Sequence, residues 1–419
     1  MKVLLIGSGG REHALGWKLA QSPRVRSLLS LPGNPGLAEL GPTIEGIDPL
    51  DGQAVADEAQ HHRVDFVVIG PEAPLAAGLA DLLLAVGIPV WGPTQSAARL
   101  ESSKAYAKGV MKRAGVPTAA WAGFDDLTGA LQFLDSQTPP FVIKADGLAA
   151  GKGVVVTDDR KEAADWVRRC LGGAFGRPAV IIEEFLSGPE VSVFAMCAGR
   201  EVAVLEPARD YKRLRDGDRG PNTGGMGSYS PVPDLPPSLL SFATEEVFRP
   251  VLEKLEEEGN RYSGFLYAGL VLGENGPSVL EFNCRLGDPE TQVMIPRLEN
   301  DLLDVIEDGI DEQLATVDLK WSPDAFVNVV VAAPGYPDSP RKGIPIRTGS
   351  FEPNALLFHG GTSLAGKQLV SAGGRVLNVV GSGSDLASAR AAAYDALDRI
   401  EFPGAQFRSD IAAQIGLSE

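Results

Sequence analysis

The residues best suited to chemistry are Glu281, Asn283 and Arg285, at the end of the stretch Ser278 to Cys284. That stretch is predicted to be a β-strand, in which alternate side chains share a face, so the three polar groups should lie in one row. Glu and Asn oxygens are the ligands that Mg²⁺ takes when it also holds nucleotide phosphates. A guanidinium beside them could neutralise a phosphoryl group during its transfer. A solvated strand face on which Glu281 pairs with Arg285 is the alternative.

The elements that must position this row form a predicted hairpin. Its first strand runs from Phe265 to Leu272, and Glu274, Asn275 and Gly276 supply turn residues before the second strand. The opposite face of that second strand is expected to pack in the core, through Leu280, Phe282 and Cys284.

A glycine loop follows the first predicted strand, residues 2–6. A dinucleotide fingerprint would need glycine at position 12, where this chain has Glu12, and an acidic residue at the end of the second strand, which ends in Ser30, Leu31 and Pro32. Both departures from the fingerprint argue against an NAD-binding site. The turn at Gly7, Gly9 and Gly10 still suits a single phosphate at a helix N-terminus, with Arg11 adding charge. A tight turn without a ligand remains the alternative.

A second glycine-rich segment, Lys144 to Val154, lies between two predicted strands, 141–145 and 154–157. It is not a Walker loop, because no Ser or Thr follows Lys152 and no helix follows the loop. Its glycines, Gly147, Gly151 and Gly153, would let a hairpin cover a polyphosphate, and Lys144 and Lys152 would bring positive charge to it. An ordinary glycine hairpin with solvated lysines is the alternative.

Two further segments carry weaker signals. The strand 179–183 leads into EEFLSGPE, where extended backbone could face a purine edge and Glu190 could bind ribose hydroxyls. The segment Asp210 to Gly227 combines Asp210 and Lys212 with a PNTGGMG turn, which suits a loop that closes over substrate. A domain hinge and a disordered surface loop are the respective alternatives.

The composition restricts the class of protein. With 419 residues, 44% hydrophobic and 22% charged, the chain is predicted to be globular with about three domains. A net charge of −17 without a basic stripe argues against a nucleic-acid surface. Three widely spaced cysteines indicate neither disulfides nor zinc, which favours a reducing cytosol. Neither a signal peptide nor a membrane span is predicted.

The order of elements predicts an α/β and α+β multidomain protein. Strand, turn and helix alternate over the first hundred residues, which is typical of a doubly wound parallel sheet whose ligands sit at the carboxyl ends of strands. A strand-rich middle follows, and the last ninety or so residues, from about 325, are predicted to be a small α+β unit.

Several motifs together resemble one family. The chain contains, in order, GSGGREHA, PGNPG, GPEAPL, KADGLAAGKGV, EEFL, PNTGGMG, GFLYAGL and EFNCRLGDPETQ. This set closely resembles the phosphoribosylamine–glycine ligases (glycinamide ribonucleotide synthetases) of the ATP-grasp superfamily, over nearly the whole chain. The resemblance implies an N-terminal doubly wound domain at 1–101, an ATP-grasp domain at 102–324 with a small flap subdomain at about 122–187, and a C-terminal domain at 325–419.

The resemblance also implies the reaction. Glycine's carboxylate would attack the γ-phosphate of ATP, and the nitrogen of 5-phospho-β-D-ribosylamine would displace phosphate from the resulting glycyl phosphate, as a step of purine biosynthesis. The cofactor would be Mg²⁺, for which Mn²⁺ substitutes in the family. Small molecules would be the partners, without nucleic acid or membrane, and a cytoplasmic monomer is expected.

Roles for individual residues follow from the same resemblance. The metal ligands would be Glu281 and Asn283. The residues contacting ATP would be Lys104, Lys144, Gly151, Lys152, Gly153, Glu183, Glu184, Phe185, Leu186 and Glu190. Those at the site of glycyl phosphate or on the substrate side would be Arg285, Asp288, Asp210 and Lys212. Those binding the ribosylamine substrate would be Gly9, Gly10, Arg11, Asn34, Glu72, Thr223, Gly224 and Gly225.

The chain departs from the family pattern at three places. The strand 265–272 has no acidic residue, so phosphates or water would have to complete the metal coordination. Tyr211 stands where histidine is expected, and Pro189 where an acidic residue is common. Three rival functions remain open: an ATP-grasp ligase that carboxylates or formylates a purine intermediate, an NAD-dependent oxidoreductase, and a nucleotide-binding regulator without activity.

Overall fold

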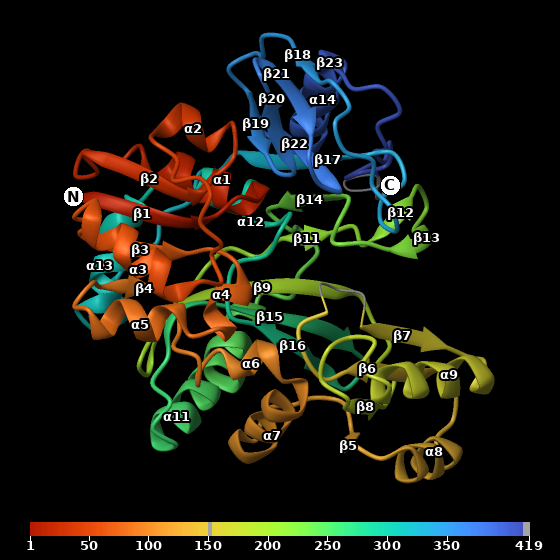
Figure 1. The fold of residues 1–419 in the computed structure, drawn as a ribbon. Coiled ribbons are helices and arrows are strands. Elements are labelled where there is room, and N and C mark those ends of the chain that lie inside the picture. Colours follow the sequence, from red (N-terminus) through yellow and green to blue (C-terminus); the bar gives the residue numbers. More distant parts are fainter. Residues whose placement is uncertain (150–152, 414–419) are drawn as a thin grey trace.

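The computed structural model describes residues 1–149 and 153–413. Gly151 and Lys152, both predicted to contact ATP, lie outside the described residues. Figure 1 shows the N-terminal sheet, a central region with two sheets, and a C-terminal sheet above them. The multidomain fold class predicted from the sequence is confirmed.

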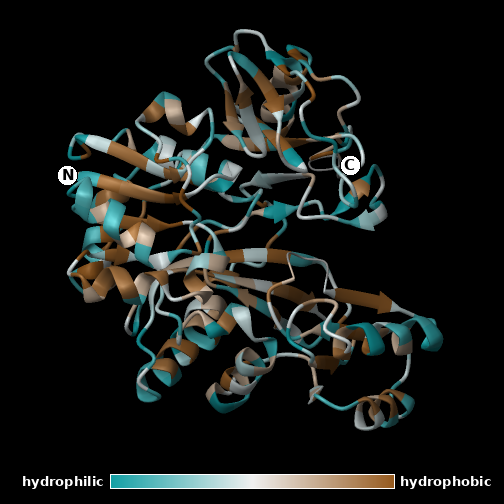
Figure 2. Ribbon diagram, in the orientation of Figure 1, coloured by the Kyte–Doolittle hydropathy of each residue, from teal (hydrophilic) through white to brown (hydrophobic). Residues whose placement is uncertain are grey.

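The N-terminal sheet is parallel, with strand order β2-β1-β3-β4. Its strands are β1 (Lys2–Gly7), β2 (Ser27–Pro32), β3 (Phe66–Ile69) and β4 (Val90–Trp91). The helices between them are α1 (Gly10–Leu19), α2 (Leu37–Leu40), α3 (Gly52–His61), α4 (Glu72–Ala76) and α5 (Leu79–Ala85). The strands are apolar and almost entirely buried, as parallel strands covered on both faces must be, and they are brown in Figure 2.

The small subdomain of the central region contains a four-stranded sheet of order β5-β8-β6-β7. Its elements are β5 (Trp121–Phe124), α8 (Leu127–Asp135), β6 (Phe141–Ala145), β7 (Val154–Thr157), α9 (Arg160–Leu171) and β8 (Val180–Glu183). Strands β6 and β7 pair antiparallel, so the predicted glycine hairpin is confirmed. Helices α6 (Arg99–Ser102) and α7 (Lys104–Ala114) connect this part to the N-terminal sheet.

The larger central sheet has the order β10-β9-β15-β16. Its strands are β9 (Glu190–Ala198), β10 (Glu201–Val204), β15 (Ser263–Gly273) and β16 (Gly276–Asn283). Around it lie α10 (Leu239–Phe242), a π-helical turn (Ala243–Phe248), α11 (Arg249–Glu257), α12 (Thr291–Met294), a 3-10 turn (Ile295–Arg297), α13 (Leu302–Ile310) and a second 3-10 turn (Leu314–Thr316). No helix in residues 1–149 and 153–413 combines the length and apolar character needed to cross a bilayer.

One core residue was predicted wrongly in the hairpin. A β-bulge shifts the register of β15 and β16, so that Gly269 pairs with Glu281 but Leu270 pairs with Val279, and Leu280 is left over. Val279 and Phe282 are therefore buried, whereas Leu280 is only half-buried. Beyond the bulge the alternation is as predicted, with Glu281 and Asn283 on the face opposite Phe282.

The C-terminal sheet has the order β11-β14-β17-β22-β19 and takes two strands from the middle of the chain. Its strands are β11 (Arg209–Asp210), β14 (Gly227–Ser230), β17 (Ala325–Ala332), β19 (Ala355–His359) and β22 (Arg375–Gly383), and α14 (Leu386–Leu397) packs on it. Three two-stranded ribbons pair β12 (Arg213–Arg215) with β13 (Arg219–Asn222), β18 (Arg347–Thr348) with β23 (Ile400–Glu401), and β20 (Thr362–Ala365) with β21 (Gln368–Ser371).

Candidate active site

Glu281 lies at the end of β16 in a strongly positive environment. Burial alone would raise the pKa of its carboxyl, but Lys144, Lys104, Lys212 and Arg285 more than offset this and lower the pKa below the ordinary value. The group is therefore an ionised carboxylate at neutral pH, surrounded by cations from four different segments.

Arg285 does not form its ion pairs with Glu281. Among the described residues, its guanidinium lies 3.3 Å from Glu72 and 3.2 Å from Glu101, measured to the carboxylate oxygens, and its Nη2 donates to Asn283 Oδ1 at 2.9 Å. A solvated strand face held by a Glu281–Arg285 pair is thus not what forms. Arg285 instead links the predicted metal row to the first turn of α4.

Glu101, on α6, is a member of this network that sequence reasoning missed. Its carboxylate accepts the backbone N–H of Cys284 at 2.7 Å and so fixes the end of the row. Burial raises the pKa of Glu101 to about 7, with a contribution from the Glu72 carboxylate and against the effect of Arg285. Its helical sequence, RLES, carries no signal that would have predicted this contact.

A buried cluster of two lysines and one glutamate lies where the two central sheets meet. Glu183 Oε2 is 2.9 Å from Lys144 Nζ and 3.1 Å from Lys108 Nζ, and Lys144 also donates to the Leu280 carbonyl at 3.3 Å. Burial lowers the pKa of Lys108 to about 8, although Glu183 opposes the shift. Lys108 was not predicted. Both lysines bind the Oε2 atom of Glu183, whose side chain is buried.

The remaining residues predicted to contact ATP lie around this cluster. Lys104 Nζ donates to the Gly147 carbonyl at 2.9 Å, at the base of the glycine hairpin. Glu184 and Phe185 are exposed, and Leu186 is half-buried. The Gly153 carbonyl accepts the Ala145 N–H at 2.7 Å, which closes the hairpin, and Glu190 forms an ion pair with Lys212.

A cavity of about 420 Å³ opens between the first glycine loop and the C-terminal sheet. It is lined by Ser8, Gly9, Gly10, Pro32, Gly33, Asp288, Gly360, Gly361, Thr362, Ala372, Gly373, Arg375 and Asn378. A Cβ on Gly10 would lie 2.2 Å from Asn378 Nδ2, so only glycine lets the two parts approach this closely. The cavity is therefore built by both ends of the chain.

The five N-terminal residues predicted for the ribosylamine substrate divide into two groups. Gly9 and Gly10 line the cavity, whereas Arg11, Asn34 and Glu72 are not among its lining residues. Asn34 uses its amide hydrogens on the carbonyls of residues 8 and 359, both at 2.9 Å. Arg11 is buried against the carboxylate of residue 12, with a separation of 2.6 Å.

Glu12 also changes what the glycine loop offers. Its carboxylate accepts the Gly9 N–H at 2.7 Å, so this backbone donor is already used and is not free for a phosphate. The glycine loop therefore offers one backbone N–H fewer to a phosphate than the sequence predicted.

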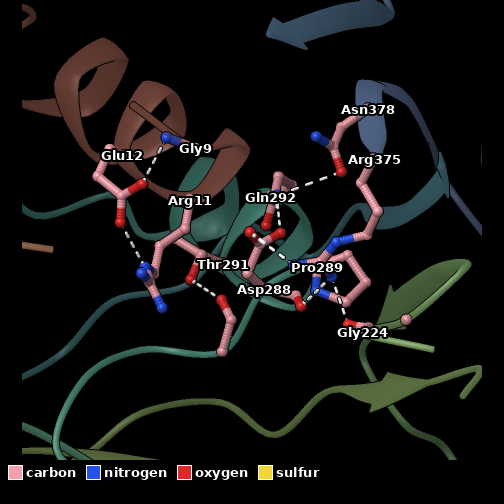
Figure 3. A network of polar contacts seen from close by, with 12 residues as sticks. Gly9, Arg11, Glu12, Gly224, Asp288, Pro289, Thr291, Gln292, Arg375 and Asn378 are labelled. Carbon is pink, nitrogen blue, oxygen red and sulfur yellow. Dashed lines mark hydrogen bonds and ion pairs between the residues drawn. The ribbon is translucent and has the colours of Figure 1, made fainter. Parts of the chain in front are cut away.

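Arg375, at the start of β22, was not predicted and brings positive charge to the cavity. Its guanidinium lies 3.0 Å from Asp288 Oδ2 and also donates to the carbonyls of Asp288 and Gly224 (Figure 3). Burial would raise the pKa of Asp288, but Arg375 and Arg11 lower it below the ordinary value. Arg375 therefore joins the exit of the hairpin to the PNTGGMG turn.

The predicted residues of that turn are held in place by local bonds. Thr223 Oγ1 donates to the Lys212 carbonyl at 2.9 Å and accepts the Gly225 N–H at 3.0 Å. Gly224 N–H donates to the Tyr336 hydroxyl at 2.9 Å. The turn thus lies beside both Lys212 and the C-terminal sheet.

Asp210 and Lys212 lie near a second buried carboxylate, Glu290. Ser192 Oγ donates to Glu290 Oε1 at 3.0 Å, and burial together with Asp210 raises the pKa of Glu290 to about 7. Burial also raises the pKa of Asp210, against the effect of Lys212. Two acidic groups near one lysine form a place where a cationic substrate group would be favoured.

A divalent metal fits the row at the end of β16. The described residues contain no group of three His, Cys, Asp or Glu side chains placed to hold a metal. Glu281 offers an ionised carboxylate. Asn283 Oδ1 accepts one hydrogen bond from Arg285 at 2.9 Å and keeps a second lone pair, so the two residues suit a Mg²⁺ ion that takes its other ligands from phosphates and water.

The comparisons with known proteins agree with this architecture. The phosphoribosylglycinamide synthetase N domain matches residues 1–101, its ATP-grasp (A) domain residues 102–291, and its C domain residues 326–414. The phosphoribosylamine–glycine ligase of Ralstonia nicotianae is 47% identical over 98% of each chain, and that of Streptomyces coelicolor is 48% identical over 99% of each.

Solved structures give the same result. The phosphoribosylamine–glycine ligase of Thermotoga maritima superposes with a TM-score of 0.86 at 36% identity, over 98% of this chain and 100% of the other. The biotin carboxylase domain of a 2-oxoglutarate carboxylase from Hydrogenobacter thermophilus shares the fold, with a TM-score of 0.73 at 18% identity over 97% of this chain and 91% of the other. The chain therefore belongs to the phosphoribosylglycinamide synthetase family.

Proposed function

We propose that this protein is an ATP-dependent ligase that joins glycine to 5-phospho-β-D-ribosylamine through glycyl phosphate, giving glycinamide ribonucleotide, ADP and phosphate. The observation that carries the proposal is the ionised Glu281 among four cations, beside Asn283, at the junction of the two central sheets. Such a site can hold a metal-bound polyphosphate and neutralise charge during phosphoryl transfer.

The chemistry needs two steps. A carboxylate oxygen of glycine attacks the γ-phosphorus and ADP leaves, so a poor electrophile becomes an acyl phosphate. The amine of the ribosylamine then attacks the carbonyl carbon, phosphate leaves, and the nitrogen loses a proton. Positioning and charge neutralisation supply most of the catalysis.

The proposed roles follow the positions of the residues. Lys104 and Lys144 contact the ATP phosphates. The backbone of residues 184–186 faces adenine, with Glu190 near the ribose. Glu281 and Asn283 would hold Mg²⁺, which would supply Lewis-acid stabilisation of the phosphate charge. Mn²⁺ is proposed as its substitute.

The cavity of about 420 Å³ is proposed as the ribosylamine site, with Arg375 as the cation for its 5-phosphate. Asp210, Lys212 and Glu290 are proposed to surround glycine, because two carboxylates of raised pKa there would be stabilised by an ammonium group. The proposed units are 1–101, 102–324 and 325–419, and the enzyme is proposed to act as a cytoplasmic monomer.

The test is ADP release with each substrate omitted in turn, together with mass detection of the product. ADP release should need glycine, the ribosylamine and a divalent metal. Release that is independent of glycine, or equal with another amino acid, would contradict the proposal. Glu281→Gln should abolish most turnover, whereas Glu274→Gln, on the exposed turn of the same hairpin, should not.

A further inference from the structure

The segment between Lys212 and Thr223 has few means of holding itself in place. It forms the β12–β13 ribbon, whose residues are mostly exposed and which pairs with no other strand in the part of the chain that the structure describes. An isolated two-stranded ribbon is marginally stable in water. Yet both of its ends reach the candidate active site, because Thr223 N–H donates to the Lys212 carbonyl at 2.8 Å and the next residue, Gly224, contacts Arg375.

Arg408, close to the end of the described chain, holds the ribbon from outside. Its side chain is only 1% exposed. Its guanidinium forms a bidentate pair with the Asp410 carboxylate, at 2.7 and 2.6 Å. It also donates to Asp218 Oδ1 at 2.7 Å and to the Arg213 carbonyl at 3.2 Å. Its guanidinium carbon lies 4.7 Å from the centre of the Tyr211 ring. A buried guanidinium with this many partners fixes its surroundings firmly.

The neighbours of Arg408 extend the contact along the turn of the ribbon. Ser409 N–H donates to Asp216 Oδ1 at 2.9 Å, and Gly217 N–H donates to Asp410 Oδ2 at 2.8 Å. Three consecutive residues of the C-terminal segment therefore hold three consecutive residues of the turn, 216–218. Ala412 N–H adds a bond to the Tyr211 hydroxyl at 2.9 Å, between Asp210 and Lys212 in the sequence.

We infer that Arg408 is a positioning residue for the ligation reaction: by holding the turn 216–218 it keeps Lys212 and Gly224 against the active site and so helps to keep water away from glycyl phosphate. This inference rests on the proposed function. Within residues 1–149 and 153–413 the partners of Arg408 are Asp410, Asp218, the Arg213 carbonyl and the Tyr211 ring, so it acts through the ribbon.

Loss of the Arg408 contact is expected to uncouple the conversion of ATP to ADP from ligation. If water reaches the acyl phosphate, its oxygen attacks the carbonyl carbon, the bond to phosphate breaks, and glycine and phosphate are formed with release of a proton. ATP is then converted to ADP without ligation. The ratio of ADP to glycinamide ribonucleotide formed in one reaction measures this loss.

The experiment compares that ratio in the wild type, Arg408→Lys and Asp218→Asn. Lysine keeps the charge but cannot reproduce the planar contact, and Asn tolerates the positive φ of 51° at position 218. The Asp218 side chain is 70% exposed, so its replacement should not prevent folding. Unfolded molecules form neither product, so the ratio does not depend on the folded fraction.

We expect the ratio to rise at least about twofold in both variants. The KM for ATP should change much less than the ratio, because Lys104 and Lys144, which are proposed to contact the ATP phosphates, lie on other segments. Arg399→Lys is the matched control, since Arg399 pairs with Glu352 at 2.8 Å elsewhere in the C-terminal part and should give the wild-type ratio. A wild-type ratio in Arg408→Lys and Asp218→Asn overturns the inference, whatever their overall rate. A wild-type enzyme that forms no glycinamide ribonucleotide refutes the proposed function instead.

Discussion

Lowering the pH from about 8 to about 5 should weaken the contact between helix α1 and the C-terminal sheet, because two neutral histidines, His13 and His359, are buried there. The backbone N–H of His359 donates to His13 Nδ1 at 2.8 Å. The ring Nδ1 of His359 is hydrogen-bonded to Thr362 Oγ1 at 3.1 Å. His13 is 6% exposed and His359 is 8% exposed. Burial lowers the pKa of His13 to about 3, with a smaller effect of His359, and burial lowers the pKa of His359 to about 4.

The sign and size follow from proton linkage. Since both pKa values are lower in the folded protein than the ordinary 6.5, the unfolded chain binds protons first as the pH falls. The stabilisation is complete above pH ~6.5 and is lost as the pH falls toward 3–4. Each histidine lowers the free energy of unfolding by roughly 1.4 kcal/mol for every pH unit below 6.5. At pH ~5 the loss is about 2 kcal/mol for one histidine and about 4 kcal/mol for the pair.

The assay is urea denaturation at several pH values, with hydrogen exchange at the His359 amide to detect local opening in a multidomain chain. The variant His13→Asn/His359→Asn keeps the hydrogen-bonding groups but does not titrate. Glu101 and Glu290 stabilise the folded state as the pH falls over this range, because their pKa values are raised in the folded protein. Their contribution is the same in the wild type and in the double variant, so it cancels when the two are compared. His61→Asn, at an exposed site, is the control. Equal pH slopes in the wild type and the double variant would refute the reasoning.

Three further changes test other parts of the structure. Arg375→Lys should raise the KM for the ribosylamine by about 10- to 100-fold, the equivalent of losing a charge-assisted hydrogen bond, and leave the KM for ATP unchanged in steady-state assays. Gly10→Ala places a Cβ 2.2 Å from Asn378 Nδ2 and should lower the free energy of unfolding by about 1–3 kcal/mol, measured by urea denaturation. An unchanged midpoint would mean that the cavity wall rearranges without cost. Lys108→Met should destabilise the protein by about 3 kcal/mol by leaving a buried carboxylate with one cation fewer, whereas Lys112→Met, exposed on the same helix, should have little effect.

Most elements of the fold could be predicted because their signals are local. The strands Phe141–Ala145 and Val154–Thr157 have the predicted bounds, since each is a short apolar run between glycine, proline or polar residues. The bulge at Leu280 could not be predicted, because an extra residue in one strand depends on how its partner pairs.

The candidate site was predicted only where it is made of one strand or one loop. Glu281, Asn283 and Arg285 are recognisable because period-two alternation places them together. Glu101 and Arg375 could not be found in this way, since each reaches the site from a segment that is distant in sequence and has no special composition. Their roles arise from tertiary packing: Glu101 caps the N–H of Cys284, and Arg375 spans two loops.

Glu12 connects the sequence argument to the chemistry of the cavity. Its presence at the third glycine position of a dinucleotide fingerprint argued against NAD, and the structure supplies the physical reason. A Cβ on Gly7 would lie 2.4 Å from Glu12 Cγ, so the Glu12 side chain fills the space that the glycines leave, and its carboxylate takes the Gly9 N–H. A loop that already binds its own anion has less positive potential for a pyrophosphate. The charge for a substrate phosphate must then come from elsewhere, and of the residues that line the cavity Arg375 is the cationic one. In the proposed ribosylamine site, the C-terminal sheet therefore supplies the cation for the phosphate, through Arg375.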